Sequence, residues 1–192
     1  MPKQAQFERE EVLESLIPLF IDKGYNGASM QDIVDYSQLN RSSIYNSFGD
    51  KYQLYQAVLK KYAERQNNIS DKILSKHHNV RTALKMFLLE LFIEGDHAPN
   101  VNGCLLSKCA LEMSEDKGAV KELVESSKKV MLQSFEEVLA EGQTRQQIKS
   151  EVHPHSMALF IYNTIQGLRI MNAHTVDVQD TKAIIDSLFQ QI

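Results

Sequence analysis

The amino-acid sequence predicts an all-α protein with two parts: an N-terminal three-helix domain that contains a helix-turn-helix, and a larger C-terminal helical domain. Three observations support this prediction. Four prolines and eight glycines in 192 residues leave long stretches free to be helical. Apolar residues recur at helical spacing, and no period-two alternation is long enough to indicate a sheet. The composition, 43% hydrophobic and 24% charged, is typical of globular proteins.

The first predicted helix runs roughly from Gln4 to Lys23. Its apolar residues follow the helical period, and Gly24 comes directly after it as a C-terminal stop. Pro18 lies inside this helix and predicts a kink or an early 3₁₀ turn, because proline has no backbone N–H to donate.

Two short helices joined by a tight turn are predicted at about residues 29–48. Ser29 is placed to cap the first of them, Met30–Ser37, and Asp32 follows three residues later, where it can interact with the amides of the first turn. The turn covers residues 38–40, and its last residue, an asparagine, caps the second helix, Arg41–Phe48. Together these elements form a helix-turn-helix.

The rest of the chain predicts longer helices. Asp50 caps a helix from Lys51 to about Leu74, which would connect the two domains. The later helices are predicted at Val80–Glu94, Leu105–Met113, Ala119–Glu141, His155–Ala173 and Gln179–Gln190. Residues 95–103 and 142–154 are rich in turn-forming residues and predict loops.

The predicted domains are therefore residues 1–50 and residues 51–192, with the helix at 51–74 as their connector. The chain has a formal net charge of −4, and residues 1–65 hold eight basic against nine acidic side chains. Any binding of nucleic acid must then depend on the local arrangement of a few cations, because bulk attraction is absent.

Four segments of the first third carry a family pattern: Leu19–Tyr25, Ala28–Ile33, Ser43–Phe48 and Lys51–Leu54. They resemble the TetR family of repressors in the glycine-aromatic pair, the capped second helix, the Ile-Tyr and Phe of the third helix, and the lysine that opens the fourth. The resemblance implies a homodimeric regulator of double-stranded, near-palindromic operator DNA, released by a small-molecule inducer.

By this resemblance the third helix enters the major groove, and seven residues contact bases or the sugar-phosphate backbone. Arg41 suits guanine or phosphate, and Asn46 suits an adenine edge. Tyr45 and Lys51 match residues that bind backbone phosphates. The predicted DNA contacts are Ser29, Arg41, Ser42, Ser43, Tyr45, Asn46 and Lys51.

One residue departs from the family pattern, since Gln38 occupies a turn position where the family commonly has glycine. The alternative interpretation of this region is plain surface structure, which its slightly acidic balance favours. The apolar residues of the region are expected to form the core of the small domain instead of contacting DNA. They are Phe20, Ile33, Ile44, Phe48 and Leu54.

The C-terminal part is expected to hold a pocket for a mainly apolar or aromatic small molecule. Its candidate lining residues are aromatic or methionine side chains, for which ordinary core packing is the alternative. They are Tyr62, Met86, Phe87, Leu91, Phe92, Met113, Met131, Phe135 and Tyr162.

Two apolar stripes near the C-terminus resemble the helix pair that forms the family's four-helix dimer interface. Core packing must account for part of each stripe. The predicted interface residues are Phe160, Ile161, Thr164, Ile165, Leu168, Met171, Ile185, Leu188 and Phe189.

Cys104 stands at a predicted helix start, where the helix dipole favours thiolate, so it is a candidate sensor of electrophiles. The alternative is a small buried residue closing the helix, and Cys109 is expected in the core. The five-residue spacing of these two cysteines makes a disulfide unfavourable. His153 and His155 flank a proline and suit helix capping better than metal binding, so no metal or cofactor is expected.

No pattern of an enzyme is present, and no leader or apolar run of membrane-spanning length is found, so we expect a cytoplasmic, non-enzymatic protein without a membrane partner. The sequence favours a TetR-like repressor released when a small molecule, or an electrophile at Cys104, acts on the C-terminal domain. The alternative is a helical small-molecule-binding protein that does not regulate DNA.

Overall fold

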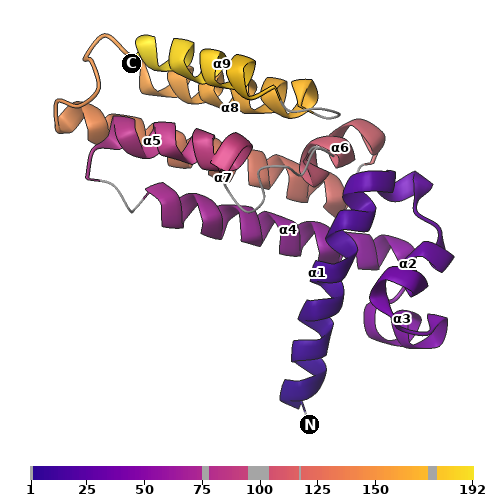
Figure 1. The fold of residues 1–192 in the computed structure, drawn as a ribbon. Coiled ribbons are helices and arrows are strands. Elements are labelled where there is room, and N and C mark those ends of the chain that lie inside the picture. Colours follow the sequence, from indigo (N-terminus) through magenta and orange to yellow (C-terminus); the bar gives the residue numbers. More distant parts are fainter. Residues whose placement is uncertain (1, 75–77, 95–103, 117, 173–176) are drawn as a thin grey trace. The chain divides into compact units, whose positions relative to one another are not determined.

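The computed structural model describes residues 2–74, 78–94, 104–116, 118–172 and 177–192, and these form helices without any strand (Figure 1). The elements are α1 (Pro2–Gly27), α2 (Met30–Ser37), α3 (Arg41–Phe48), α4 (Lys51–Leu74), α5 (Val80–Leu89), the π-helix η1 (Glu90–Glu94), α6 (Leu105–Glu112), α7 (Ala119–Thr144), α8 (Pro154–Met171) and α9 (Val178–Gln190). The all-α prediction is confirmed.

The bounds predicted for α2, α3 and α4 are confirmed, but the prediction for α1 is wrong in one respect. The residue with non-helical dihedrals inside α1 is Gly24, at φ 69° and ψ −175°, and not Pro18. Glycine reaches positive φ at little cost, so the direction of the chain changes there. Pro18 is exposed, and the helix continues through it.

Two later predictions are also corrected, and two others cannot be compared. The helix predicted at Val80–Glu94 is α-helical only to Leu89 and then widens into η1. Helix α7 continues to Thr144, into a stretch predicted as a loop. The predicted loop at 95–103 and the predicted end of the eighth helix at Ala173 lie outside the described residues.

The chain packs into two compact units, and the first combines two separate stretches of sequence, residues 1–66 and 104–126. Its core brings together apolar residues of α1, α2, α3, α4 and α6. The five residues predicted to form this core are confirmed there, with exposed fractions of 6% or less: Phe20, Ile33, Ile44, Phe48 and Leu54. Cys109 is buried in the same core, as predicted.

The second unit contains residues 67–103 and 127–192. Its core joins α5, η1, α7, α8 and α9, with the rings of Phe87 and Phe135 in edge contact at 5.8 Å. Helices α8 and α9 lie side by side (Figure 1). No helix of the described ranges is both long and apolar enough to cross a bilayer.

Candidate functional site

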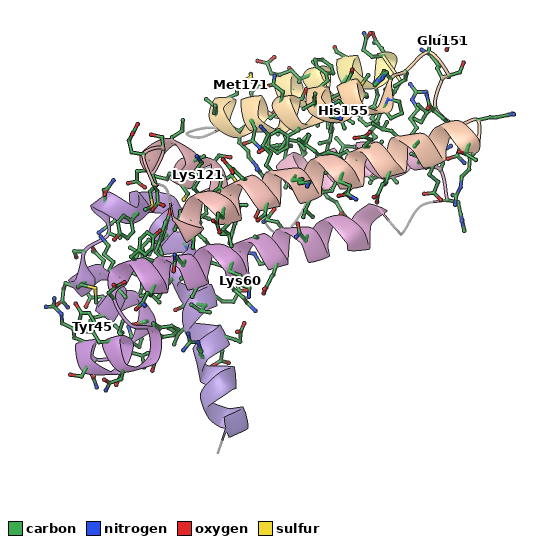
Figure 2. All side chains as sticks on the ribbon, turned by 180° about the vertical axis from the view of Figure 1, so that it is seen from behind. Tyr45, Lys60, Lys121, Glu151, His155 and Met171 are labelled. Atoms are coloured by element: carbon green, nitrogen blue, oxygen red, sulfur yellow. The ribbon has the colours of Figure 1, made fainter. Side chains whose placement is uncertain are left out.

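Helix α3 presents one polar face and one buried stripe. Ile44 and Phe48, four residues apart, are buried, whereas Tyr45 is 42% exposed (Figure 2). The polar residues of the exposed side are Arg41, Ser42 and Asn46, and Ser43 is half-buried. Four of the predicted contact residues on α3 therefore share a solvent-facing surface, as a helix entering a groove requires.

The turn before α3 is stabilised by local hydrogen bonds. Gln38 adopts the left-handed conformation at φ 58°. This is the backbone conformation expected at a turn position where the family commonly has glycine. The side-chain amide of Gln38 donates to the Asp35 carbonyl at 2.5 Å, a bond that glycine could not make. Asn40 accepts the Ser43 N–H at 2.8 Å and so caps α3. The helix-turn-helix thus keeps its tight turn without a glycine.

Ser29 caps α2 in a complete capping box with Asp32. Its hydroxyl donates to the Asp32 carboxylate at 2.7 Å and accepts the Asp32 N–H at 3.1 Å. Lys23 donates to the same carboxylate at 2.5 Å, and hydrogen bonds from Lys23 and then Ser29 hold the Asp32 pKa well below its ordinary value. Because the Ser29 hydroxyl hydrogen is engaged, a phosphate at this end would meet the backbone amides of α2.

Lys51 opens α4 and lies over an aromatic ring. Its Nζ is 4.5 Å from the centre of the Tyr25 ring, a cation–π contact. Asp50 and Gln53 cap the helix reciprocally: the Asp50 carboxylate accepts the Gln53 N–H at 2.8 Å, and the Gln53 amide oxygen accepts the Asp50 N–H at 3.0 Å. The ammonium of Lys51 therefore lies at the capped amino end of α4, where the helix dipole has the same sign.

Several other cations of this unit are neutralised by carboxylates. Lys61 contacts Glu10 at 2.6 Å, and Arg65 contacts Glu14 at 3.1 Å. Arg41 and Lys51 form no ion pair with another described residue. A region with a slightly acidic total charge therefore still presents unneutralised cations, among them Arg41 on α3 and Lys51 at the start of α4.

Sequence reasoning missed two residues of α6 that hold the end of α1. The Glu112 carboxylate accepts the N–H groups of Tyr25 at 2.8 Å and Asn26 at 3.0 Å, just after the break at Gly24. Lys108 donates to the Ile21 and Asp22 carbonyls just before it. The spacing of Lys108 and Glu112 on one helix face is visible in the sequence, but their partners are 86 or 87 residues away.

The two cysteines are buried and form no disulfide. Cys104 is the N-cap residue of α6, as its place before the helix predicted, and only 5% of it is exposed. Burial raises the pKa of the Cys109 thiol, which favours the protonated, unreactive form.

The predicted ligand-pocket residues do not meet in one place. Tyr62 and Met113 pack in the core of the first unit. The second unit's core contains five of the others: Phe87, Leu91, Phe92, Met131 and Phe135. Met86 and Tyr162 are half-buried, and the ring of Tyr162 lies 5.9 Å from the Lys128 ammonium.

The predicted interface residues divide between core and surface. Six lie in the second unit's core, with exposed fractions of 3% or less, because the inner sides of α8 and α9 pack on the other helices of that unit: Ile161, Ile165, Leu168, Ile185, Leu188 and Phe189. Phe160 and Met171 are 48% and 56% exposed. With Thr164 and Leu188 they line an open groove of about 610 Å³ along α8 and α9, together with Met157 and Ile184.

The histidines near α8 act locally. His153 caps α8 and accepts the Ser156 N–H at 3.5 Å. His155 lies on the first turn, with its Nδ1 3.0 Å from the Glu136 carboxylate. Within the described ranges, no three potential ligands gather in a metal-binding cluster.

Comparison with known proteins covers both units. A family described as "Bacterial regulatory proteins, tetR family" matches residues 12–58, and one described as "Tetracyclin repressor-like, C-terminal domain" matches residues 80–188. The chain is 23% identical to the HTH-type transcriptional repressor ComR of Escherichia coli (strain K12) over 165 residues, which is 85% of this chain and 79% of that protein.

Two solved structures share the fold. A TetR-family transcriptional regulator from Cytophaga hutchinsonii superposes with a TM-score of 0.87 at 17% identity, over 98% of this chain and 94% of that one. The TetR-family regulator CifR, in a cysteine mutant solved with a 26-base-pair double-strand operator DNA, gives a TM-score of 0.81 at 21% identity, over 95% of each chain.

Proposed function

The chain belongs to the TetR family of bacterial regulatory proteins and is a DNA-binding transcriptional regulator, and from that premise we propose that it represses transcription as a homodimer on a near-palindromic operator until a small molecule releases it. Its relatives are transcriptional regulators and not enzymes. In this proposal residues 1–50 bind DNA, residues 51–192 bind ligand and dimerise, and the helix at 51–74 connects the two functions.

The observation that carries the proposal is the exposed polar face of α3 opposite its buried stripe of Ile44 and Phe48. Arg41 and Asn46 lie on this face and would contact base edges, Arg41 with guanine or phosphate and Asn46 with adenine. Ser42 and Ser43, in the first turn of the same helix, would contact the sugar-phosphate backbone.

Phosphate contacts would fix the position of α3 in the groove. Tyr45 would donate its exposed hydroxyl, and Lys51 would offer its ammonium at the capped start of α4. At Ser29 the contact would come from the backbone amides of α2, because the hydroxyl already donates to Asp32.

The dimer face would be the outer side of α8 and α9. Phe160 and Met171 are large apolar side chains that remain about half exposed, and they border the groove along both helices. A two-fold axis would place a second copy of this surface against the first and so cover both. The six buried residues of the predicted interface would support this face from behind.

The inducer would be an apolar or aromatic molecule that binds among the aromatic side chains of α5, η1 and α7. The π-helical turn η1 supports this location, because such turns are frequent at functional sites. An electrophile acting at Cys104 is a second candidate trigger, and the place of this thiol at a helix N-terminus supports it. Since 95% of the residue is buried, that reaction would require local opening.

The test is an anisotropy titration of the purified protein with the duplex upstream of its own gene, with and without a thiol-alkylating electrophile. Saturable, salt-sensitive binding of a dimer is the expected result. Release by the electrophile that is lost in Cys104→Ser would assign the thiol, and release unchanged in that variant would remove Cys104 from the mechanism. No saturable binding to this duplex or to neighbouring promoters would favour the alternative, a small-molecule-binding protein that does not regulate DNA.

A further inference from the structure

We propose that Arg9 is a positioning residue that holds the C-terminal end of α3 and so sets how sharply this chain discriminates between DNA sequences. The inference rests on the proposed function, in which α3 reads base edges. It assigns a role in recognition to a residue of α1 that lies outside the helix-turn-helix.

The contact joins two helices that are distant in sequence. Arg9 Nη1 donates to the carbonyl of Ser47, which is 38 residues away. Its guanidinium carbon also lies 4.5 Å from the centre of the Phe48 ring. One planar cation therefore makes a hydrogen bond and an aromatic contact with the last two residues of α3.

Helix α3 has few other attachments to the rest of the unit. It contains eight residues, and only Ile44 and Phe48 are buried. Residues four apart lie on a single stripe of a helix, so two such anchors leave the helix free to roll about that stripe. Arg9 binds the carbonyl of Ser47, beside the stripe, and opposes this rotation.

The end of α3 also requires a cation from elsewhere. The last turn of the helix contains no basic residue, although the last carbonyls of a helix lack intrahelical partners and carry partial negative charge. The Gly49 N–H satisfies the Tyr45 carbonyl at 3.0 Å. Arg9 satisfies the Ser47 carbonyl and complements the dipole.

The predicted consequence differs between the two kinds of DNA contact. Hydrogen bonds to base edges are directional and weaken steeply when a donor is misaligned, whereas attraction to phosphate depends mainly on charge and tolerates small displacements. Loosening α3 should therefore reduce discrimination between sequences more than it reduces general affinity for DNA.

The second unit offers a matched control. Arg81 donates to the carbonyl of Phe189, in the last turn of α9, at 2.5 Å. This contact has the same chemistry as that of Arg9, an arginine from one helix binding a carbonyl at the end of another, but it lies far along the chain from α3. Arg81→Gln should show what the loss of such a contact does to the fold alone.

The experiment compares full-length wild type, Arg9→Gln, Arg9→Lys and Arg81→Gln. The duplex upstream of the gene, and versions of it with one base pair replaced in each half-site, are titrated at several salt concentrations. Thermal unfolding is followed in parallel. We expect Arg9→Gln to reduce the ratio of affinities for the native and replaced duplexes about tenfold, with the slope of log affinity against log salt unchanged. Arg9→Lys should retain part of the ratio, and Arg81→Gln all of it.

Two results would overturn the proposal. An unchanged ratio in folded Arg9→Gln would leave Arg9 without a part in discrimination. A uniform loss of affinity for all duplexes, with the salt slope reduced by about one, would make Arg9 a phosphate contact instead. Failure of the wild type to bind any duplex is a different outcome, because it would reject the proposed function itself.

Discussion

In the first unit, ion pairs with carboxylates determine which cations remain available to contact DNA. Lys23, Lys61 and Arg65 are paired with carboxylates, whereas Arg41 and Lys51 form no ion pair with a described residue. Total charge could not reveal this difference, because it counts paired and unpaired cations alike. The sequence did predict the caps at Ser29 and Asn40 and the demand on Gln38, because those interactions span three residues or fewer.

The residues that the sequence did not predict have distant partners. Glu112 binds backbone amides 86 and 87 residues away, and Arg9 binds a carbonyl 38 residues away. A charged side chain on a helix surface has many possible partners, and only the packed structure selects one.

The pKa of Asp32 makes stability depend on pH. The folded state lowers this pKa through hydrogen bonds from Lys23 and Ser29, so the stabilisation is complete above the unfolded pKa of about 4 and is lost as the pH falls through the lower folded value. We expect the thermal midpoint of the wild type to fall below about pH 4, and Asp32→Asn to lack this component of the decrease. The thermal midpoints of both proteins, measured between pH 2 and pH 7 at on the order of one value per pH unit, test this expectation.

Lys23→Met provides a second test of the same network. Removal of the ammonium should move the Asp32 pKa toward its ordinary value and reduce the pH dependence in the same direction as Asp32→Asn. Identical acid profiles for the wild type and both variants would show that this carboxylate does not contribute to stability.

Tyr45 and Lys51 are expected to act on DNA and not on the fold, since Tyr45 is exposed and Lys51 is only partly covered. Tyr45→Phe and Lys51→Ala should each weaken operator binding by on the order of 1–2 kcal/mol, and Lys51→Ala should lower the salt slope by about one. Anisotropy titrations at several salt concentrations measure both quantities. Affinity equal to that of the wild type would remove the residue concerned from the interface.

Cations from other helices bind backbone carbonyls near the ends of three helical segments of this protein. Neither α3 nor α9 has a basic residue in its last turn, yet Arg9 and Arg81 bind carbonyls there. Lys108 does the same at Ile21 and Asp22, where α1 approaches the break at Gly24. These hydrogen bonds satisfy terminal carbonyls and also fix one helix against another.

Lys108→Met should therefore destabilise the protein by about 1–2 kcal/mol, because two carbonyls at the end of a helical segment lose a charged donor. Chemical denaturation followed by circular dichroism measures the free energy of unfolding. The control is Lys60→Met, since Lys60 lies exposed on α4 (Figure 2) and makes no ion pair with a described residue. Equal losses in the two variants would contradict the capping role.

Element bounds followed from the sequence where caps are local, as in α2 and α3. The stop at Gly24 was predicted too and is confirmed by its positive φ, whereas the kink predicted at Pro18 is absent. The π-helical turn η1 was missed for another reason: five residues are too few for its apolar pattern to be told from that of an α-helix.

At the scale of the whole molecule, the fold class was predicted correctly, and the division of the C-terminal stripes between core and surface was left open by the sequence. The helical spacing of apolar residues identified the stripes of α8 and α9. This spacing does not indicate which neighbouring element covers each side of a helix. Ile161, Ile165 and Ile185 are therefore core residues, while Phe160 and Met171 remain at the surface. The proposed pocket residues divide between two cores for the same reason.

The proposed dimer face gives a prediction for the assembly. Phe160→Glu places a charge at the groove and should convert the dimer to a monomer, with operator affinity reduced by about 100-fold or more because the two half-sites are no longer bound together. Sedimentation equilibrium and operator titration measure the two effects. Leu159→Glu is the matched control, because Leu159 is also exposed on α8 but does not line the groove. A monomeric Leu159→Glu with a dimeric Phe160→Glu would place the interface elsewhere.

The first unit is assembled from two separate stretches of sequence, residues 1–66 and 104–126. A single recombination junction in the gene therefore cannot transfer the whole unit from one protein to another. Glu112 and Lys108 hold both sides of the break at Gly24, and Cys109 lies within the same core. A recombination that exchanged only the first 66 codons between two such regulators would combine an α1 from one parent with an α6 from the other. Chimeras that keep residues 104–126 together with the N-terminal segment of the same parent should fold. Exchange of the whole first unit between two regulators would therefore need more than one recombination junction.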